Sequence, residues 1–437
     1  MKKKHLFLIP ALTLGFSSSA WAQDVHPALT TVASKIDTKA EYFTMNKLSG
    51  DLAAATQYLD LMIDTARKSG EPVPAGLKAK DIMGALGIDT IKAYGLSSTK
   101  VDNAWVNRSF LDNAGNHKGI FSIFGSKNQD FKVTSMAPAG TDLALQMQLD
   151  LRQIETIANA IANSVGEGEK TKKAMSKEIP EMDMTVSDLL SKINVTANVV
   201  MDLDANKTVP TPFGEVGRPL VTVRLDGLAW LWDKFGERAI FESEAPFKKS
   251  VEGDLTYYRI PAEVLKQEAG NQEAAIIDMF GISPVILIDK KSNHIWMSSN
   301  EEHLQKCRSS KNTLAETAEF KAAFDGLPNK GNSMAYVSKY LLKEISEKYT
   351  RIADSGMLGE EFGVAKPLVD RLMEDITESD KGWSMTLGLD DKGVAVTSRG
   401  PLASKHLNYL TSILPLLQAG SIHEEKFEMD APRRRAQ

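Results

Sequence analysis

The chain has 437 residues, with 52 lysines and arginines against 57 aspartates and glutamates, and a formal net charge of −5. Its 42% hydrophobic and 25% charged residues are typical of a globular protein, which excludes a disordered, collagen-like or coiled-coil chain. The mildly acidic balance lacks the basic footprint that a phosphate backbone requires, so nucleic acid is not an expected partner.

The N-terminal segment 1–22 has the three parts of a secretory signal peptide. It begins with the basic run Lys2–Lys4, continues with the apolar run Leu6–Phe16, and ends with the small-x-small cleavage sequence Ala20-Trp21-Ala22. The apolar run is too short to span about 30 Å of hydrocarbon. We therefore expect cleavage before Gln23, and a periplasmic or extracellular protein.

The remaining chain offers neither a membrane span nor a disulfide. Its most apolar stretch, 407–417, is shorter than the roughly 18 residues that a transmembrane helix needs and contains Pro415. The single cysteine, Cys307, has no partner for an intramolecular disulfide. Stability is therefore expected to come from core burial.

Hydrophobic periodicity predicts units in which a strand leads into an amphipathic helix. Such units are expected at 42–62, 143–161, 220–232 and 334–349. Helices at 186–193 and 369–376 should each precede a hairpin, with strands at 195–203 and 221–225 in one case and at 383–389 and 394–398 in the other. A strand is expected near 120–124, and solvated loops at 166–181 and 206–219. The predicted fold class is α+β with mainly antiparallel strands.

Four short patterns recur in the same order at offsets of 186 to 194 residues. They pair 86–89 with 280–283, 103–106 with 294–297, 144–145 with 335–336, and 203–204 with 389–390. This repeat predicts two related halves, each with strand–helix units packed against an antiparallel sheet. We expect a first α+β half at 23–215, a second at 216–425, and a flexible tail at 426–437.

The segment 293–337 carries a resemblance to a known family. It contains Trp296-Met297-Ser298-Ser299-Asn300, a short helix, the run Leu314–Phe324, and Leu327-Pro328 leading to the strand Met334–Val337. In this order it resembles a bacterial family of exported proteins known only as a domain of unknown function. The resemblance implies an exported protein of this fold and brings no catalytic residues with it.

Two motifs have the residue types of metal sites. Asp202–Asn206 has the alternating oxygen ligands of a calcium loop, but Lys207 and Phe213 stand where such a loop needs glycine and glutamate, so we expect a plain turn. His303 and Cys307 are one helical turn apart and could supply two zinc ligands. No further cysteine is available, so we expect a partly buried Cys307 beside a surface His303. No metal or other cofactor is predicted.

The sequence shows no catalytic constellation in a suitable context, and no nucleotide-binding motif. We therefore expect a non-catalytic binding or envelope-associated module, whose partner is a hydrophobic small molecule or an envelope protein. The alternative is an extracytoplasmic hydrolase built from scattered loops, with His117, His294 or His406 as the base. If a hydrophobic ligand binds, the candidate contacts are Trp230, Trp232, Met297 and Met334.

Overall fold

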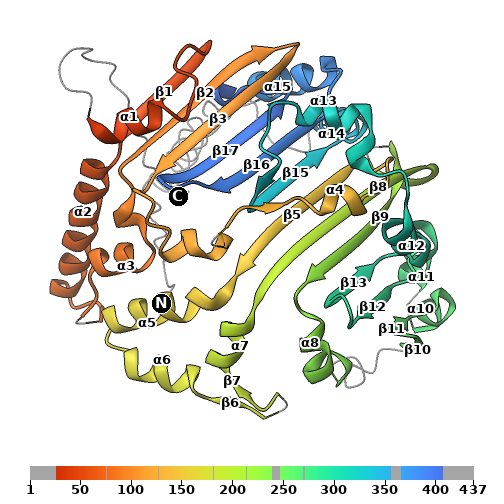
Figure 1. The fold of residues 1–437 in the computed structure, drawn as a ribbon, viewed down its shortest axis with the longest axis horizontal. Coiled ribbons are helices and arrows are strands. Elements are labelled where there is room, and N and C mark those ends of the chain that lie inside the picture. The colour runs from red at the N-terminus through yellow and green to blue at the C-terminus, as the bar shows by residue number, and fades with distance from the viewer. Residues whose placement is uncertain are drawn as a thin grey trace, which may run out of the picture.

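The computed structural model describes residues 26–406, apart from 75, 126, 181, 213, 239–246, 269–270 and 356–365. Its centre is one antiparallel sheet of thirteen strands (Figure 1). In spatial order the strands are β1 (Tyr42–Lys47), β2 (Ala93–Val101), β3 (Ala104–Asp112), β17 (Gly393–Gly400), β16 (Trp383–Leu389), β15 (Ser333–Val337), β5 (Leu143–Asp150), β8 (Asn194–Thr211), β9 (Gly214–Asp226), β13 (His294–Ser298), β12 (Val285–Asp289), β11 (Leu255–Arg259) and β10 (Lys248–Glu252). The predicted α+β class with antiparallel strands is confirmed.

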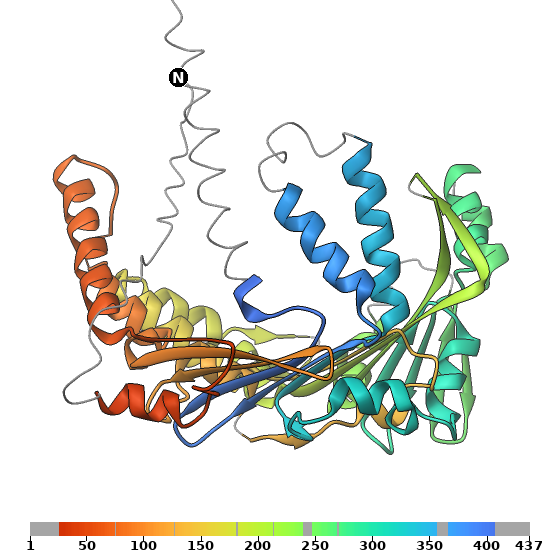
Figure 2. The ribbon, with the colours of Figure 1, turned by 90° about the horizontal axis from the view of Figure 1, so that it is seen from above.

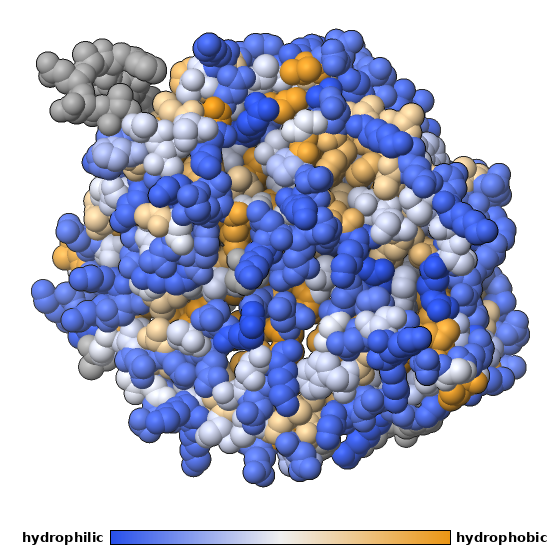
Figure 3. Space-filling model, in the orientation of Figure 1, coloured by the Kyte–Doolittle hydropathy of each residue, from blue (hydrophilic) through white to orange (hydrophobic). Residues whose placement is uncertain are grey.

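Short helices cover one face of this sheet, which we call the covered face (Figure 2). They are α1 (Pro27–Ala33), α4 (Val133–Met136), α12 (Glu301–Ser309) and α13 (Ala318–Phe324). The largest core cluster lies beneath the last three of them and contains Met334 and Tyr336 of β15 together with Leu304 of α12. Figure 3 looks onto this side, where hydrophilic side chains dominate the surface.

The other helices lie on the opposite side of the sheet or at its edges. Figure 2 shows α2 (Ser49–Lys68), α14 (Lys339–Asp354) and α15 (Lys366–Glu378) rising from the sheet on the side away from α1. The remaining helices are α3 (Ala79–Ala85), α5 (Ile154–Ser164), α6 (Gly168–Met175), α7 (Val186–Lys192), α8 (Ala229–Leu231), α10 (Ala262–Glu268) and α11 (Asn271–Phe280). No helix in the described part of the chain is long and apolar enough to cross a bilayer.

Strands from the two ends of the chain alternate in blocks within the sheet. The block β17-β16-β15 lies between β3 and β5, and β13-β12-β11 follows β9. The expected boundary between 215 and 216 falls inside β9, while the expected signal peptide and tail lie outside the described residues. All thirteen strands therefore belong to one continuous sheet.

The predicted strand–helix units are present, and side-chain caps mark the starts of two helices, α14 of the unit at 334–349 and the predicted helix α7. In α14 the Ser338 hydroxyl accepts a hydrogen bond from the Leu341 N–H, and in α7 Thr185 and Asp188 form a reciprocal capping box. Each cap satisfies backbone donors that would otherwise lack a partner, which stops the preceding strand and starts the helix.

Three local predictions were wrong. The segment predicted as a loop at 166–181 contains α6, because glutamate, lysine and alanine favour helix even where charge is high. The predicted strand near 120–124 is a 3-10 helix at Gly119–Phe124.

The third error concerns the segments 202–206 and 206–219. Instead of a turn and a loop they continue β8 and β9 as a long hairpin, with an irregularity between Asp204 and Thr208 that absorbs the extra residues.

Candidate apolar binding site

The central strands have an unusual distribution of polar and apolar side chains. Alternate residues of a strand point to opposite faces of the sheet. The pairing of residues between neighbouring strands then shows which residues share a face. On β5 the half-buried or exposed Leu143, Leu145 and Met147 alternate with the buried Gln146 and Gln148. Polar side chains are thus buried under helices while apolar ones face the other side.

The same inversion is found on β8, β9 and β16, while β15, between β16 and β5, buries the apolar Met334 and Tyr336 on the covered face. The polar residues of the covered face, each at most 8% exposed, are Gln146, Gln148, Asn198, Asp202, Thr222, Arg224, Ser384 and Thr386. The apolar residues of the opposite face, which we call the open face, are Leu143, Leu145, Met147, Leu149, Ala197, Val199, Met201, Val221, Val223, Leu225, Trp383, Met385 and Leu387. Every one of these thirteen remains partly accessible or exposed, with Met147 at 39%.

The buried polar residues attach the covering segments to the sheet. The Gln146 amide oxygen accepts from the Val133 N–H at 3.0 Å, which ties β5 to α4. The Thr222 hydroxyl lies 2.7 Å from His303 Nδ1, which ties β9 to α12. Asn332 donates to the Phe124 carbonyl at 2.8 Å. Because these groups have partners, burying them is tolerated.

A hollow of about 340 Å³ lies on the open face between the sheet and the pair α14–α15. Its apolar lining consists of Leu342, Ile376, Trp383, Met385, Val396, Pro401 and Leu402. Its polar lining consists of Asn107, Ser109, Ser398 and Ser404. This hollow is our candidate binding site because apolar pockets with few polar groups are typical of ligand sites.

The polar end of the hollow is already hydrogen-bonded within the protein. The Asn107 amide nitrogen donates to the Ser398 hydroxyl at 3.2 Å and to the Leu402 carbonyl at 2.9 Å. Its amide oxygen accepts from Ser98 and from the Ser404 N–H, each at 2.8 Å. The segment 401–404 is thereby fastened over β3, and Asn107 has no amide hydrogen left for a ligand.

The four predicted ligand contacts do not converge on one site. Trp232 and Met297 pack in a cluster with Tyr258 at the far end of the open face, where the two rings of Trp232 and Tyr258 lie 5.3 Å apart. Trp230 donates its indole N–H to the Gly227 carbonyl at 3.0 Å. Met334 is 2% exposed in the main core on the covered face.

The sequence analysis did not select Trp383 and Met385, although a signal for them exists. The run Trp383-Ser384-Met385-Thr386-Leu387 alternates perfectly and was predicted as a strand. The alternation identifies two faces but does not say which one the helices will cover.

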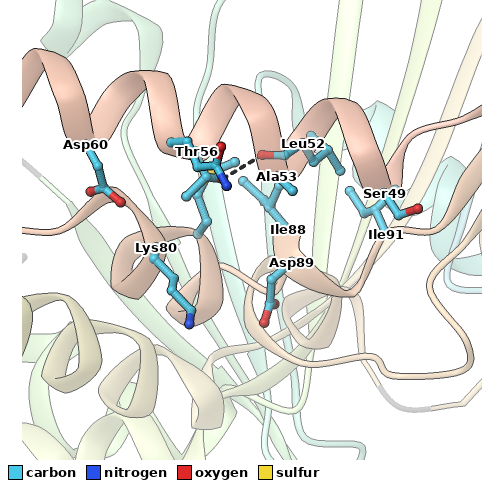
Figure 4. A pocket seen from close by; sticks show the side chains of 11 residues that line it. Ser49, Leu52, Ala53, Thr56, Asp60, Lys80, Ile88, Asp89 and Ile91 are labelled. Carbon is cyan, nitrogen blue, oxygen red and sulfur yellow. Dashed lines mark hydrogen bonds between the residues drawn. The ribbon is translucent and has the colours of Figure 1, made fainter.

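A second hollow, of about 320 Å³, lies between α2 and the segment 80–91 (Figure 4). Its two carboxylates both hold the fold together. Asp60 accepts from the Ala79 N–H at 2.6 Å at the start of α3, and Asp89 pairs with Lys118 at 3.3 Å. This hollow is lined by α2, α3 and residues 88–91 and by no strand of the sheet, so it does not belong to the open face.

His303 and Cys307 differ from the prediction, because both are buried, at 1% and 3% exposed. His303 was predicted at the surface, but its ring bridges the Thr222 hydroxyl and Asp202, whose carboxylate lies 3.4 Å from Nε2. Among the described residues no group of three or more potential ligands is arranged to hold a metal ion.

The order hydroxyl, imidazole, carboxylate formed by Thr222, His303 and Asp202 matches that of a hydrolase triad. Thr222, however, is 0% exposed and its hydroxyl also contacts Ser298 at 2.8 Å. A nucleophile must reach its substrate, so this row links α12 to the sheet and does not form a hydrolytic site.

The three histidines expected as hydrolase bases have other partners. His117 contacts the Asp390 carbonyl at 2.9 Å, His294 lies 3.5 Å from Asp226, and His406 lies 3.9 Å from Asp375. Within the described ranges none of them has a hydrogen bond to a serine or threonine hydroxyl.

Neither a family model, nor a curated protein, nor a solved structure matches this chain. The resemblance over 293–337 therefore stays a prediction.

Proposed function

We propose that this chain is an exported, non-catalytic binding protein whose open face takes a hydrophobic ligand. The observation that carries the proposal is the inverted polarity of β5, β8, β9 and β16. Sheets that face water on one side normally place their polar residues there. Here apolar side chains of several adjacent strands are accessible together.

The apolar side chains of the open face lie next to one another across neighbouring strands. Burial of apolar surface stabilises by about 25 cal/mol per Å², and this stabilisation is lost while the surface is in water. A contiguous apolar surface is therefore selected for only when a ligand or partner covers it. A hydrophobic ligand in the hollow beside Trp383 and Met385 would cover the part that α14 and α15 already flank.

The order of the strands supports the further proposal of two related halves. The first half would comprise β1, β2, β3, β5, β8 and β9, and their counterparts in the second half would be, in the same order, β11, β12, β13, β15, β16 and β17. With this correspondence, the order of strands in the sheet from β1 inward is the same as the order from β11 inward. The centre of this symmetry lies between β15 and β5. Three of the four recurring patterns in the sequence lie on or at the ends of the same pairs of strands, β3 with β13, β5 with β15, and β8 with β16.

The experiment starts with expression of the whole precursor in a Gram-negative host and purification from the periplasm. A native mass spectrum should show a chain beginning at Gln23 with a bound small molecule. A neutral apolar dye, N-phenyl-1-naphthylamine, should then bind the emptied protein and be displaced by the extracted molecule.

Variants of the protein test whether the dye binds at the open face. The double variant Leu145→Glu/Met385→Glu should weaken dye binding at least about tenfold, or 1.4 kcal/mol, because it places two charges on the open face. The control Ala174→Glu/Ala322→Glu adds the same two charges at exposed positions on α6 and α13 and should leave binding unchanged. Equal dye binding by all three proteins would reject the open face as the site.

A further inference from the structure

We infer that the ligand of this site is an anionic amphiphile, a long-chain carboxylate whose tail enters the hollow and whose head group lies between Lys100 and Lys405. This inference rests on the proposed function and specifies its ligand. The first observation concerns the tail. The hollow is lined by the apolar side chains of Leu342, Ile376, Trp383, Met385 and Val396.

The polar groups of the hollow restrict what the tail can be. The hydrogen-bonding capacity of Asn107 is taken up by Ser98, Ser398, Leu402 and Ser404. A sugar or peptide buried here would leave its own polar groups with few partners, which is costly. An unbranched hydrocarbon chain requires none.

The second observation concerns charge at one end of the hollow. Lys100 Nζ and Lys405 Nζ lie 5.9 Å and 5.1 Å from the centre of the Trp105 ring. Trp105 is two residues from Asn107 on β3 and points to the same face, about 7 Å along the strand. Lys405 directly follows Ser404, which lines the hollow.

Two carboxylates lie near this pair, and one of them, Asp375, pairs with Arg371 at 3.1 Å. In the described part of the chain neither ammonium forms an ion pair with a carboxylate. Glu41 accepts from the backbone N–H of Lys100 at 3.3 Å, and Asp375 lies 3.9 Å from His406. Burial lowers the pKa of His406, which is therefore neutral at pH 7 and adds no positive charge. Two cations beside an apolar hollow are complementary to one anionic head group on an apolar chain.

A single dissolved chain fits this site better than the surface of a bilayer. The helices α14 and α15 rise beside the hollow (Figure 2), and the segment 401–404 crosses its end. These elements would keep a flat lipid surface away from Trp383 and Met385, whereas one hydrocarbon chain can enter from the side of Lys405.

The test compares oleate with oleyl alcohol, which has the same chain without the charge, by displacement of N-phenyl-1-naphthylamine from the delipidated mature protein. Oleate should bind about tenfold more tightly, and this preference should shrink as salt is added, because exposed ion pairs are weak and are screened by salt. In Lys100→Gln/Lys405→Gln the two ligands should bind equally. The control Lys172→Gln/Lys173→Gln removes the same charge from exposed positions on α6 and should keep the preference.

Each other outcome has a distinct meaning. Equal binding of both ligands by the unaltered protein, or a preference that survives loss of both lysines, would overturn the inference and leave the apolar site standing. Binding of neither ligand would reject the proposed function itself. Binding to phosphatidylglycerol vesicles without binding of free oleate would overturn the choice of a single-chain carboxylate.

Discussion

The inverted polarity of the sheet can be tested by exchanging two adjacent residues of β9. Thr222 is fully buried on the covered face, whereas its neighbour Val223 is half-buried on the open face. Thr222→Val replaces a hydroxyl with a methyl group, and Val223→Thr replaces a methyl group with a hydroxyl. The two variants therefore change nearly the same atoms. In a sheet with its apolar side inward, the first change would be harmless and the second costly.

The structure predicts the opposite order. Thr222→Val removes the hydroxyl that lies 2.7 Å from His303 Nδ1 and 2.8 Å from Ser298, and it leaves a buried ring nitrogen without a partner. Such a loss costs about 1–3 kcal/mol. Val223→Thr gives up one partly accessible methyl group, which is worth less than about 0.8 kcal/mol, and its hydroxyl can reach water.

Urea unfolding at pH 7, followed by far-ultraviolet circular dichroism, measures both free energies of unfolding. We expect Thr222→Val to lower the midpoint clearly and Val223→Thr to change it little, while Val223→Thr weakens binding of the apolar dye. If Val223→Thr proves the more destabilising of the two, the assignment of the faces is wrong and the proposed binding surface is part of the core.

Three further results should follow from the buried groups. Burial raises the pKa of Asp202, but hydrogen bonds from His303 and Lys306 outweigh burial and hold the pKa below its ordinary value. A lowered carboxyl pKa stabilises the fold above the pKa of the unfolded chain, so the stability lost in Asp202→Asn should be greatest at neutral pH and shrink below about pH 4 in urea titrations. Burial raises the pKa of Cys307 to about 12, so a thiol reagent should label the native protein far more slowly than the unfolded one. Met334→Ala, at a position 2% exposed, should lower the unfolding free energy by about 2–5 kcal/mol in the same denaturation assay.

Most elements could be predicted from the sequence because their signals are local. The alternation at 383–389 and the helical spacing at 341–349 follow from side-chain geometry within one segment. The hairpin at 195–203 and 221–225 was predicted, but its outer part was missed. The residues between Asp204 and Thr208 favour turns and form an irregularity, after which the strand pairs again with β9 from Thr208 onward. The strand with which a segment pairs cannot be predicted from the sequence of that segment alone.

The candidate site could not be predicted, for a related reason. Trp230, Trp232, Met297 and Met334 were selected by residue type, and type does not distinguish a core side chain from one in a hollow. The hollow is formed by β3, β16 and β17 together with α14, α15 and the segment 401–404, which are brought together only by the tertiary fold. The burial of Gln146 and Ser384 would have pointed to it, but burial depends on which helices dock where.

The covered face of the sheet stabilises the fold, whereas the open face provides the proposed binding surface. On the covered face, hydrogen bonds made by Gln146, Thr222 and Asn332 fix where α4, α12 and the segment 119–124 lie, and directional bonds specify position better than apolar contacts do. The apolar clusters at Tyr336 and at Tyr258 supply burial on either side of the central strands. Of the open-face residues, Leu225 packs against the cluster at Tyr258, whereas Trp383 and Met385 line the hollow and belong to none of the apolar clusters of the described residues. Substitution there can change what the site accepts while leaving the fold intact, which is the property that a binding surface requires.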